Sequence, residues 1–375
     1  MQQNLAKATG IITIDLGAIA ANWKALAARV APAECAAVVK ADAYGLGAAR
    51  VIPALVKAGC KTLFVATPSE AEAARKLAPK ATIYILYGLI DACAADYVRL
   101  DVRPVLSMYD DIRTWLDVCT KRGIRPPAGL HIDSGLNRLG LPAADTRKLA
   151  GDTTLTSGLN LSLVMSHLAS ADNPRDPKNR EQLVAFETLS NLFARIPRSL
   201  AASDGLMLGS LFHFDLVRPG YALYGGQASR DKPAPVKSVV TVVARVLAVN
   251  DVLEGGSVGY GATWRAGRRS RIAVISAGYA DGLPRGASAA TGGNGGHVMF
   301  GSFKAPVVGR VSMDLTTVDI TDLPVGAVKP GDFARLTGDG LTLEDAGSGA
   351  GTIGYEILTR LGPRFQRLYL EDELG

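Results

Sequence analysis

Short apolar runs alternate with helical patterns over the first 220 residues of the chain. The apolar residues of each run are continuous and do not alternate with polar ones, as expected for parallel strands that are covered on both faces. Eight runs are predicted to be strands: 36–40, 62–67, 82–88, 103–106, 129–133, 161–168, 199–203 and 216–220.

The segments between these runs have the features of helices. Ser69 and Glu72 have the spacing of a capping box, and residues 179–196 carry apolar side chains at helical spacing. Eight strand–helix units predict an α/β fold, the TIM (β/α)8 barrel. A doubly wound open sheet is the main alternative, because the number of units does not show that the sheet closes.

The pattern changes after residue 225. Residues 225–237 are rich in Gly, Pro and charge and are predicted to be a linker. β-type runs separated by glycine-rich turns follow, with a helical pattern near residues 352–362, which predicts a mostly β C-terminal domain.

The expected domain boundaries follow from these patterns. Residues 1–10 form an N-terminal segment that is free to pair with the C-terminal domain, 11–228 form the barrel, and 229–375 form the mostly β domain. The apolar run 10–16 fits a strand of either domain.

Composition and charge narrow the function classes. The chain has 375 residues, of which 48% are hydrophobic and 20% charged, as in globular proteins of two domains. Its net charge of +6 is spread out, without a basic run interleaved with aromatic residues, which argues against nucleic-acid binding. No apolar run reaches the roughly 18 residues of a membrane span, and no signal-peptide pattern is found, so a cytoplasmic protein is expected.

The four cysteines, Cys35, Cys60, Cys93 and Cys119, form no C-x-x-C pair and sit singly among apolar residues. We expect buried, reduced thiols and no disulfide framework. No metal site is expected.

Lys40 ends the first predicted strand and is followed by a glycine-bearing loop. The carboxyl ends of barrel strands form the active-site face. A lysine there can form a Schiff base with an aldehyde cofactor if its surroundings partly deprotonate the amine. Taken alone, the residue is better explained as a structural lysine, because lysines at strand ends are common, so further motifs have to decide.

Residues 38–47 (VVKADAYGLG) resemble the cofactor-lysine motif of the alanine racemase family. Further motifs of that family follow in order through nearly the whole chain: DSGLNRLG (133–140), SHLASAD (166–172), LVRPGYALYG (216–225), VGYGATW (258–264), SAGYADGLPR (276–285), GRVSMD (309–314) and TIGYEIL (352–358).

The resemblance implies an alanine racemase that holds pyridoxal 5'-phosphate on Lys40. Such an enzyme interconverts L- and D-alanine by two-base proton exchange at the α carbon and supplies D-alanine for peptidoglycan. Lys40 is then one acid/base group and Tyr260 the other, with His167 assisting the tyrosine. In the family this tyrosine comes from the neighbouring subunit, which implies a homodimer with shared active sites.

The resemblance also implies the residues that bind cofactor and substrate. Arg218 would face the pyridine nitrogen, and because arginine only donates hydrogen bonds, this nitrogen would stay unprotonated. Arg138 would lie near the cofactor's phenolic oxygen and the substrate carboxylate, to which Met313 would offer its backbone N–H. The residues implied for the phosphate pocket are Tyr44, Ser203, Gly220, Tyr221 and Tyr355.

Two positions depart from the family pattern. His131 stands where many members have a carbamylated lysine whose negative charge holds the arginine that matches Arg138. We therefore expect another anion or a different hydrogen-bond partner to orient Arg138. The segment AASDG (201–205) is also unusual, although Ser203 is kept.

Two other function classes stay open at this stage. One is another barrel-type pyridoxal-phosphate enzyme, a decarboxylase or a D-amino-acid aldolase, against which Arg218 and the VGYGATW motif argue. The other is a non-catalytic cofactor-binding protein, against which the predicted β domain with Tyr260 argues.

Overall fold

All eight apolar runs form strands in the computed structural model, which describes residues 7–227, 229 and 231–371. The chain forms two compact units, described separately below. One comprises Ile19–Leu223 with Ser229–Val236, and the other comprises Met1–Ala18, Tyr224–Ala228 and Lys237–Gly375. The strands of the first unit are β2 (Glu34–Cys35), β3 (Ala37–Val38), β4 (Thr62–Val65), β5 (Thr82–Ile85), β6 (Arg103–Leu106), β7 (Pro127–His131), β8 (Asn160–Met165), β9 (Arg198–Ser199) and β10 (Leu216–Val217).

The first unit is a closed barrel of parallel strands. Strands β3 to β9 pair in chain order in one sheet, and β10 pairs in parallel with β2. A parallel bridge between Ala202 and Arg218 joins the chain beyond β9 to the chain beyond β10. The Val38 N–H donates to the Pro219 carbonyl oxygen at 2.9 Å, so β2 and β3 are two halves of one strand that completes the ring. The predicted barrel is confirmed, and the open sheet is excluded.

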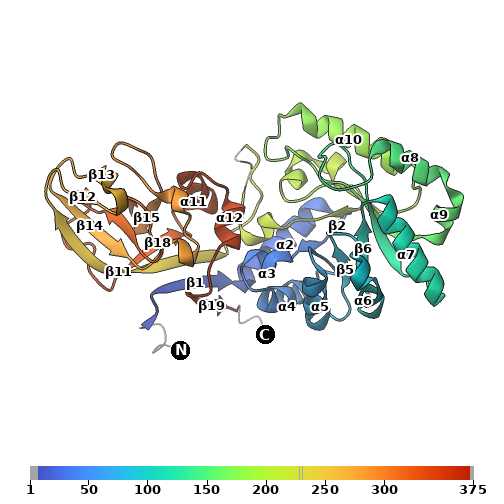
Figure 1. The fold of residues 1–375 in the computed structure, drawn as a ribbon, viewed down its shortest axis with the longest axis horizontal. Helices are drawn as coiled ribbons and strands as arrows, with labels where there is room; N and C mark the ends of the chain where they lie inside the picture. The colour runs from blue at the N-terminus through green and yellow to red at the C-terminus, as the bar shows by residue number, and fades with distance from the viewer. Residues whose placement is uncertain (1–6, 228, 230, 372–375) are drawn as a thin grey trace. The chain divides into compact units, whose positions relative to one another are not determined.

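Helices lie around the outside of these strands (Figure 1). They are α2 (Leu16–Val30), which begins in the other unit, α4 (Ala48–Ala58), α5 (Pro68–Leu77), α6 (Ala94–Arg99), α7 (Tyr109–Arg122), α8 (Ala143–Gly151), α9 (Thr153–Gly158) and α10 (Pro177–Ser190).

The capping box of α5 differs from the one predicted at Ser69 and Glu72. Thr67 is the N-cap, and its hydroxyl accepts from the Glu70 N–H at 3.3 Å while the Glu70 carboxylate accepts from the Thr67 N–H at 3.2 Å. Pro68 occupies the first helical position, where its fixed φ and missing N–H are tolerated, and this sets the start of the helix two residues earlier.

The second unit is mostly β, as predicted (Figure 1). Its main sheet has the order β16-β15-β18-β11-β1-β19, with β14 paired to β11 and β17 paired to β14. The elements are β1 (Gly10–Asp15), β11 (Val240–Val252), β12 (Ser257–Val258), β13 (Trp264–Arg265), β14 (Ser270–Ile275), β15 (His297–Phe300), β16 (Phe303–Pro306), β17 (Thr316–Asp319), β18 (Phe333–Thr337), β19 (Gln366–Leu370), α11 (Leu343–Gly349) and α12 (Gly354–Thr359).

Strand β1 belongs to this second unit. It pairs antiparallel with β11 and parallel with β19, and its buried side chains alternate with half-buried ones, with Ile12 and Ile14 fully buried. The ambiguous run near the N-terminus is therefore a strand of the β unit, and residues 11–18 group with that unit and not with the barrel. Residues 1–6 of the expected N-terminal segment lie outside the described residues.

Three further findings concern the function classes. In the described part of the chain, no helix is long and apolar enough to cross a membrane. All four cysteines are free, and only Cys93 is not buried. Among the same described residues, no group of three or more His, Cys, Asp or Glu side chains is placed to hold a metal ion.

Candidate active site

Lys40 lies two residues after β3 and begins a turn with left-handed backbone angles. The next four residues, 41–44, have φ of 52°, 54°, 54° and 57°, so the short helix α3 (Lys40–Tyr44) continues as a left-handed turn. Each non-glycine residue in this conformation costs about 1–2 kcal/mol. The turn therefore needs contacts that hold it.

The surroundings of Lys40 favour its neutral amine. Burial lowers the pKa of Lys40, the positive charge of Arg138 lowers it further, and only Glu70 raises it. A larger share of the amine is thus unprotonated at neutral pH than for an ordinary lysine, and the unprotonated amine is the form that attacks an aldehyde.

Arg218, just beyond β10, is a buried cation without a carboxylate partner among the described residues. Its guanidinium donates to the Ser166 carbonyl oxygen at 2.6 Å and to the Ser199 hydroxyl, and it lies 5.9 Å from the centre of the Phe64 ring. Burial lowers the pKa of Arg218, but an arginine stays charged in proteins. Neutral oxygens alone offset this charge, so the site favours an acceptor or an anion in front of it.

Two histidines of the barrel are neutral because they are buried close to positive charges. Burial, reinforced by Arg218, lowers the pKa of His131 to about 4 and that of His167 to about 3. Both rings therefore carry no charge at pH 7, and each has a ring nitrogen that can accept a hydrogen bond. Arg138 is exposed and makes no hydrogen bond or ion pair with the described residues, so the expected anion or other partner for it stays a prediction.

Ser203 lies beyond the carboxyl end of β9 and is hydrogen-bonded by backbone N–H groups. The Ser203 hydroxyl oxygen accepts from the N–H of Gly220 at 3.0 Å and of Ala222 at 3.1 Å, which leaves its own O–H to donate outward. A side chain at Gly220 would overlap the Tyr44 hydroxyl and lie 3.2 Å from Val38 Cβ. Tyr221, which lies between Gly220 and Ala222 in the sequence, is fully buried. A hydroxyl donor oriented in this way, at the carboxyl end of the barrel strands, suits a phosphate group.

The other expected site residues lie in the β unit. Tyr260 follows β12 in a turn with positive φ at Gly259 and Gly261, and its side chain is 71% exposed. Met313 is 54% exposed, and Tyr355 is half-buried in α12. A side chain at Gly259 would lie 3.2 Å from the backbone nitrogen of Arg310, so the turn of Tyr260 packs against the segment that leads to Met313.

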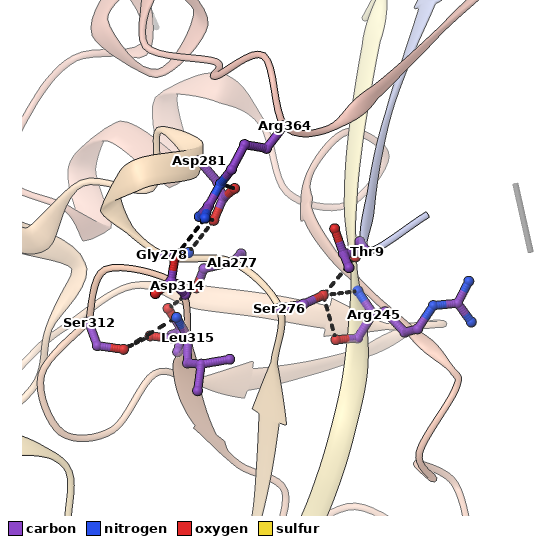
Figure 2. Close-up of polar contacts among 11 residues, drawn as sticks. Thr9, Arg245, Ser276, Ala277, Gly278, Asp281, Ser312, Asp314, Leu315 and Arg364 are labelled. Carbon is purple, nitrogen blue, oxygen red and sulfur yellow. Dashed lines mark hydrogen bonds and ion pairs between the residues drawn. The ribbon is translucent and has the colours of Figure 1, made fainter. Parts of the chain in front are cut away.

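An arginine near the end of the chain fixes the segment around Met313 (Figure 2). Arg364 donates to both carboxylate oxygens of Asp281 at 2.7 Å and to Asp314 at 2.6 Å. Asp281 is buried and also accepts from the Gly278 N–H at 2.9 Å. The Ala280 N–H donates to the Met313 carbonyl oxygen at 3.0 Å. The loop 278–281 and the segment 312–314 are therefore held as one body.

Comparison with known proteins gives the same picture over both units. Residues 14–228 match the family model "Alanine racemase, N-terminal domain", and residues 239–369 match "Alanine racemase, C-terminal domain". The chain belongs to the alanine racemase family. The alanine racemase of Methylobacterium nodulans is 46% identical over 360 residues, which is 96% of each chain. The biosynthetic alanine racemase of Agrobacterium fabrum is 43% identical, over 96% of this chain and 93% of its own.

A solved structure agrees with the fold of this family member. The alanine racemase of Bartonella henselae, crystallised with covalently bound pyridoxal phosphate, has a TM-score of 0.91 and 40% identity, covering 97% of this chain and 100% of its own. The biosynthetic alanine racemase of Pseudomonas aeruginosa has a TM-score of 0.90 and 34% identity, over 97% and 100%.

The sequence missed several residues that hold the site together. Glu70, Asp281 and Arg364 bond to segments that carry site residues, and Ser166 and Ser199 bond to Arg218. Asp281 and Ser166 lie inside recognised motifs, but a motif does not say which partner a side chain bonds. Nothing in the local sequence marks Arg364.

Proposed function

We propose that this protein is a pyridoxal-phosphate-dependent racemase that interconverts L- and D-alanine and supplies D-alanine for peptidoglycan. The observation that carries the proposal is the grouping at the strand ends of one barrel. It consists of a lysine with a lowered pKa, a buried arginine without a carboxylate partner among the described residues, and the Ser203 hydroxyl held by two backbone N–H groups. The relative from Bartonella henselae, with covalently bound pyridoxal phosphate, supports the choice of cofactor. The cytoplasmic location expected from the N-terminal sequence stays a prediction.

The chemistry of these residues fits pyridoxal phosphate. Lys40 would bind its aldehyde carbon, and Arg218 would donate to its pyridine nitrogen. The Ser203 hydroxyl, oriented by the N–H groups of Gly220 and Ala222, would donate to its phosphate. When bound, this cofactor withdraws electrons from the α carbon of an attached amino acid and makes the proton there labile. The fully buried charge of Arg218 would keep the ring nitrogen unprotonated, which moderates that withdrawal.

Two acid/base groups would move the α proton. Lys40, with its lowered pKa, takes or gives the proton on one face of the α carbon. Tyr260 serves the opposite face, and neutral His167 accepts a hydrogen bond from its hydroxyl, which assists the transfer of the tyrosine proton. Arg138 and the Met313 N–H bind the substrate carboxylate, while Tyr44, Tyr221 and Tyr355 complete the phosphate pocket.

We further propose a homodimer in which a second copy supplies Tyr260 and Met313. Both side chains are more than half exposed, and Ile353, two residues before the motif tyrosine Tyr355, is 63% exposed. Large apolar side chains exposed at several motif residues are typical of surfaces that bind a partner. A two-fold pair would complete both sites at once.

The test begins with the absorption spectrum of the purified protein. We expect the visible-edge band of lysine-bound pyridoxal phosphate, and added L-alanine should lose its optical rotation. A band without racemisation would favour a decarboxylase or an aldolase. No band after added cofactor would refute the proposal.

Gly220 offers a steric test of the phosphate pocket. Replacing Gly220 by alanine places a methyl group 2.9 Å from Tyr44 Cζ and 3.2 Å from Val38 Cβ. Overpacking of this kind costs about 1–3 kcal/mol, so the dissociation constant of pyridoxal phosphate should rise roughly tenfold. Equilibrium titration measures it.

Gly151→Ala is the matched control, because nothing lies within 4 Å of a side chain added there. Equal cofactor affinity in the two variants would contradict the placement of the phosphate at Gly220.

A further inference from the structure

We propose that Glu70 is a positioning residue for Lys40: its carboxylate ties the left-handed turn after the lysine to the start of helix α5. The inference rests on the proposed function, in which Lys40 binds the cofactor. Glu70 lies 30 positions along the chain from Lys40, on the neighbouring strand–helix unit, and belongs to none of the motifs that predicted the site.

The turn is the reason that a tie is needed. Ala41, Asp42 and Ala43 all have left-handed φ, and two of the three are alanines. Alanine is the best former of right-handed helix, and it has no side-chain group that stabilises the left-handed conformation. The local sequence therefore opposes the observed turn, and contacts from elsewhere have to maintain it.

Glu70 makes the contact at the beginning of the turn. One carboxylate oxygen accepts from the Ala41 N–H at 2.7 Å. The other accepts from the Ala66 N–H at 2.7 Å and from the Thr67 N–H at 3.2 Å. Both oxygens are thus in use, one on the residue next to Lys40 and one on the end of β4 and the N-cap of α5.

Asp42 holds the end of the turn in a similar way. Its carboxylate accepts from the N–H of Ala48, the first residue of α4, at 2.7 Å. The turn is therefore fixed between two helices, and the Glu70 bond is the one adjacent to the lysine. Loss of that bond frees the peptide bond between Lys40 and Ala41, whose orientation sets the direction of the Lys40 side chain.

The negative charge of Glu70 also acts on Lys40. Of the charged groups that act on the amine, Arg138 lowers the pKa of Lys40 and Glu70 raises it. His167, whose own pKa Lys40 lowers, is neutral. Glu70 thus offsets part of the effect of burial, and its removal should lower the pKa of Lys40 further.

Glutamine at position 70 separates the tie from the helix cap. An amide has one acceptor oxygen, whereas the carboxylate has two. Facing Ala66 and Thr67, the amide oxygen satisfies two N–H groups, and glutamine is accepted at this position of a capping box. The amide NH2 then faces the Ala41 N–H, so the cap persists and the tie is lost.

The experiment compares Glu70→Gln with Glu72→Gln in the full-length protein. Glu72 lies in the same helix and pairs with Lys76 at 3.0 Å in solvent, which makes it a matched control. The protein is freed of cofactor, pyridoxal phosphate is added, and the rate of band formation is followed over pH. Racemisation rates and thermal unfolding are measured on the reloaded protein.

We expect Glu70→Gln to lower the maximal rate of cofactor capture and kcat by roughly tenfold to a hundredfold, the usual effect of losing a charge-assisted hydrogen bond. The pH midpoint of capture should move down, because the anion that favours the ammonium form is gone. A helix cap alone would move neither. Rates and midpoint equal to those of Glu72→Gln would overturn the proposal.

A second variant tests the role of the turn itself. Glycine adopts the left-handed conformation without strain, so Ala41→Gly added to Glu70→Gln should recover part of the lost capture rate. If Glu70→Gln does not fold, recovery in this double variant supports the proposal, and failure of both to fold overturns it. A wild type without a cofactor band refutes the proposed function and this inference with it, whereas a normal wild type with an unaffected Glu70→Gln refutes the inference alone.

Discussion

Replacing Lys40 by alanine should remove the absorption band of lysine-bound pyridoxal phosphate and reduce racemisation to the level of the reaction without protein. Two functions are lost at once, since the same amine is proposed to bind the cofactor and to move the α proton. The fold should persist, because the hydrogen bonds that hold the left-handed turn involve Ala41 and Asp42 and not the Lys40 side chain. Absorption spectra and optical rotation measure both losses.

Lys61→Ala is the control for this result. Lys61 is exposed and precedes β4, at the amino end of a barrel strand, whereas Lys40 follows the carboxyl end of one. The carboxyl ends form the active-site face of a barrel, so Lys61→Ala should keep the band and the activity. A Lys40→Ala protein that still racemises alanine would contradict the assignment of the lysine.

Tyr260→Phe should lower the racemisation rate by roughly 10²–10⁴-fold, the usual contribution of a positioned acid/base group. The cofactor band should remain, because Tyr260 has no proposed contact with the aldehyde or the phosphate. Stability should also be unchanged, since the side chain is 71% exposed. One face of the α carbon would still have Lys40, so the variant should exchange the α proton of one enantiomer with deuterated solvent and not invert it.

Mass spectrometry of L- and D-alanine, incubated separately in deuterated water, distinguishes these outcomes. Tyr87→Phe is the control, because Tyr87 is also a largely exposed tyrosine, at 62%. Exchange into both enantiomers at equal rates in Tyr260→Phe would show that a different group serves the second face.

The sequence predicted the barrel strands because burial on both faces leaves a clear pattern. The run 103–106 has the same bounds as β6. The run 82–88 is longer than β5, which ends at Ile85. The apolar residues of this run continue beyond the end of β5. Leu86 and Tyr87 still donate hydrogen bonds to the carbonyl oxygens of Val65 and Ala66, at the end of β4. Pattern therefore locates a strand more reliably than it locates its ends.

The sequence predicted which residues form the site, but it did not predict the contacts that hold them in place. Motifs pointed to Lys40, but nothing in the alanines that follow it indicated a left-handed turn, because their propensity is for the opposite hand. The contacts that hold the site join distant positions, Ala41 to Glu70 and Asp281 to Arg364. Such pairs follow from the closed fold, which a single sequence does not display.

The position of β1 has a consequence for how the chain is completed. In the order β18-β11-β1-β19, strand β1 lies inside the sheet, between two strands that are synthesised much later. The barrel residues Ile19–Leu223 are all synthesised before β11, so they can fold while β1 is still unpaired.

A fragment of residues 239–369, the stretch that matches the C-terminal family model, would lack β1 and leave β11 and β19 each with an open edge. Open edges of this kind promote association between chains. The fragment should aggregate, and addition of a peptide spanning residues 7–18 should suppress the aggregation.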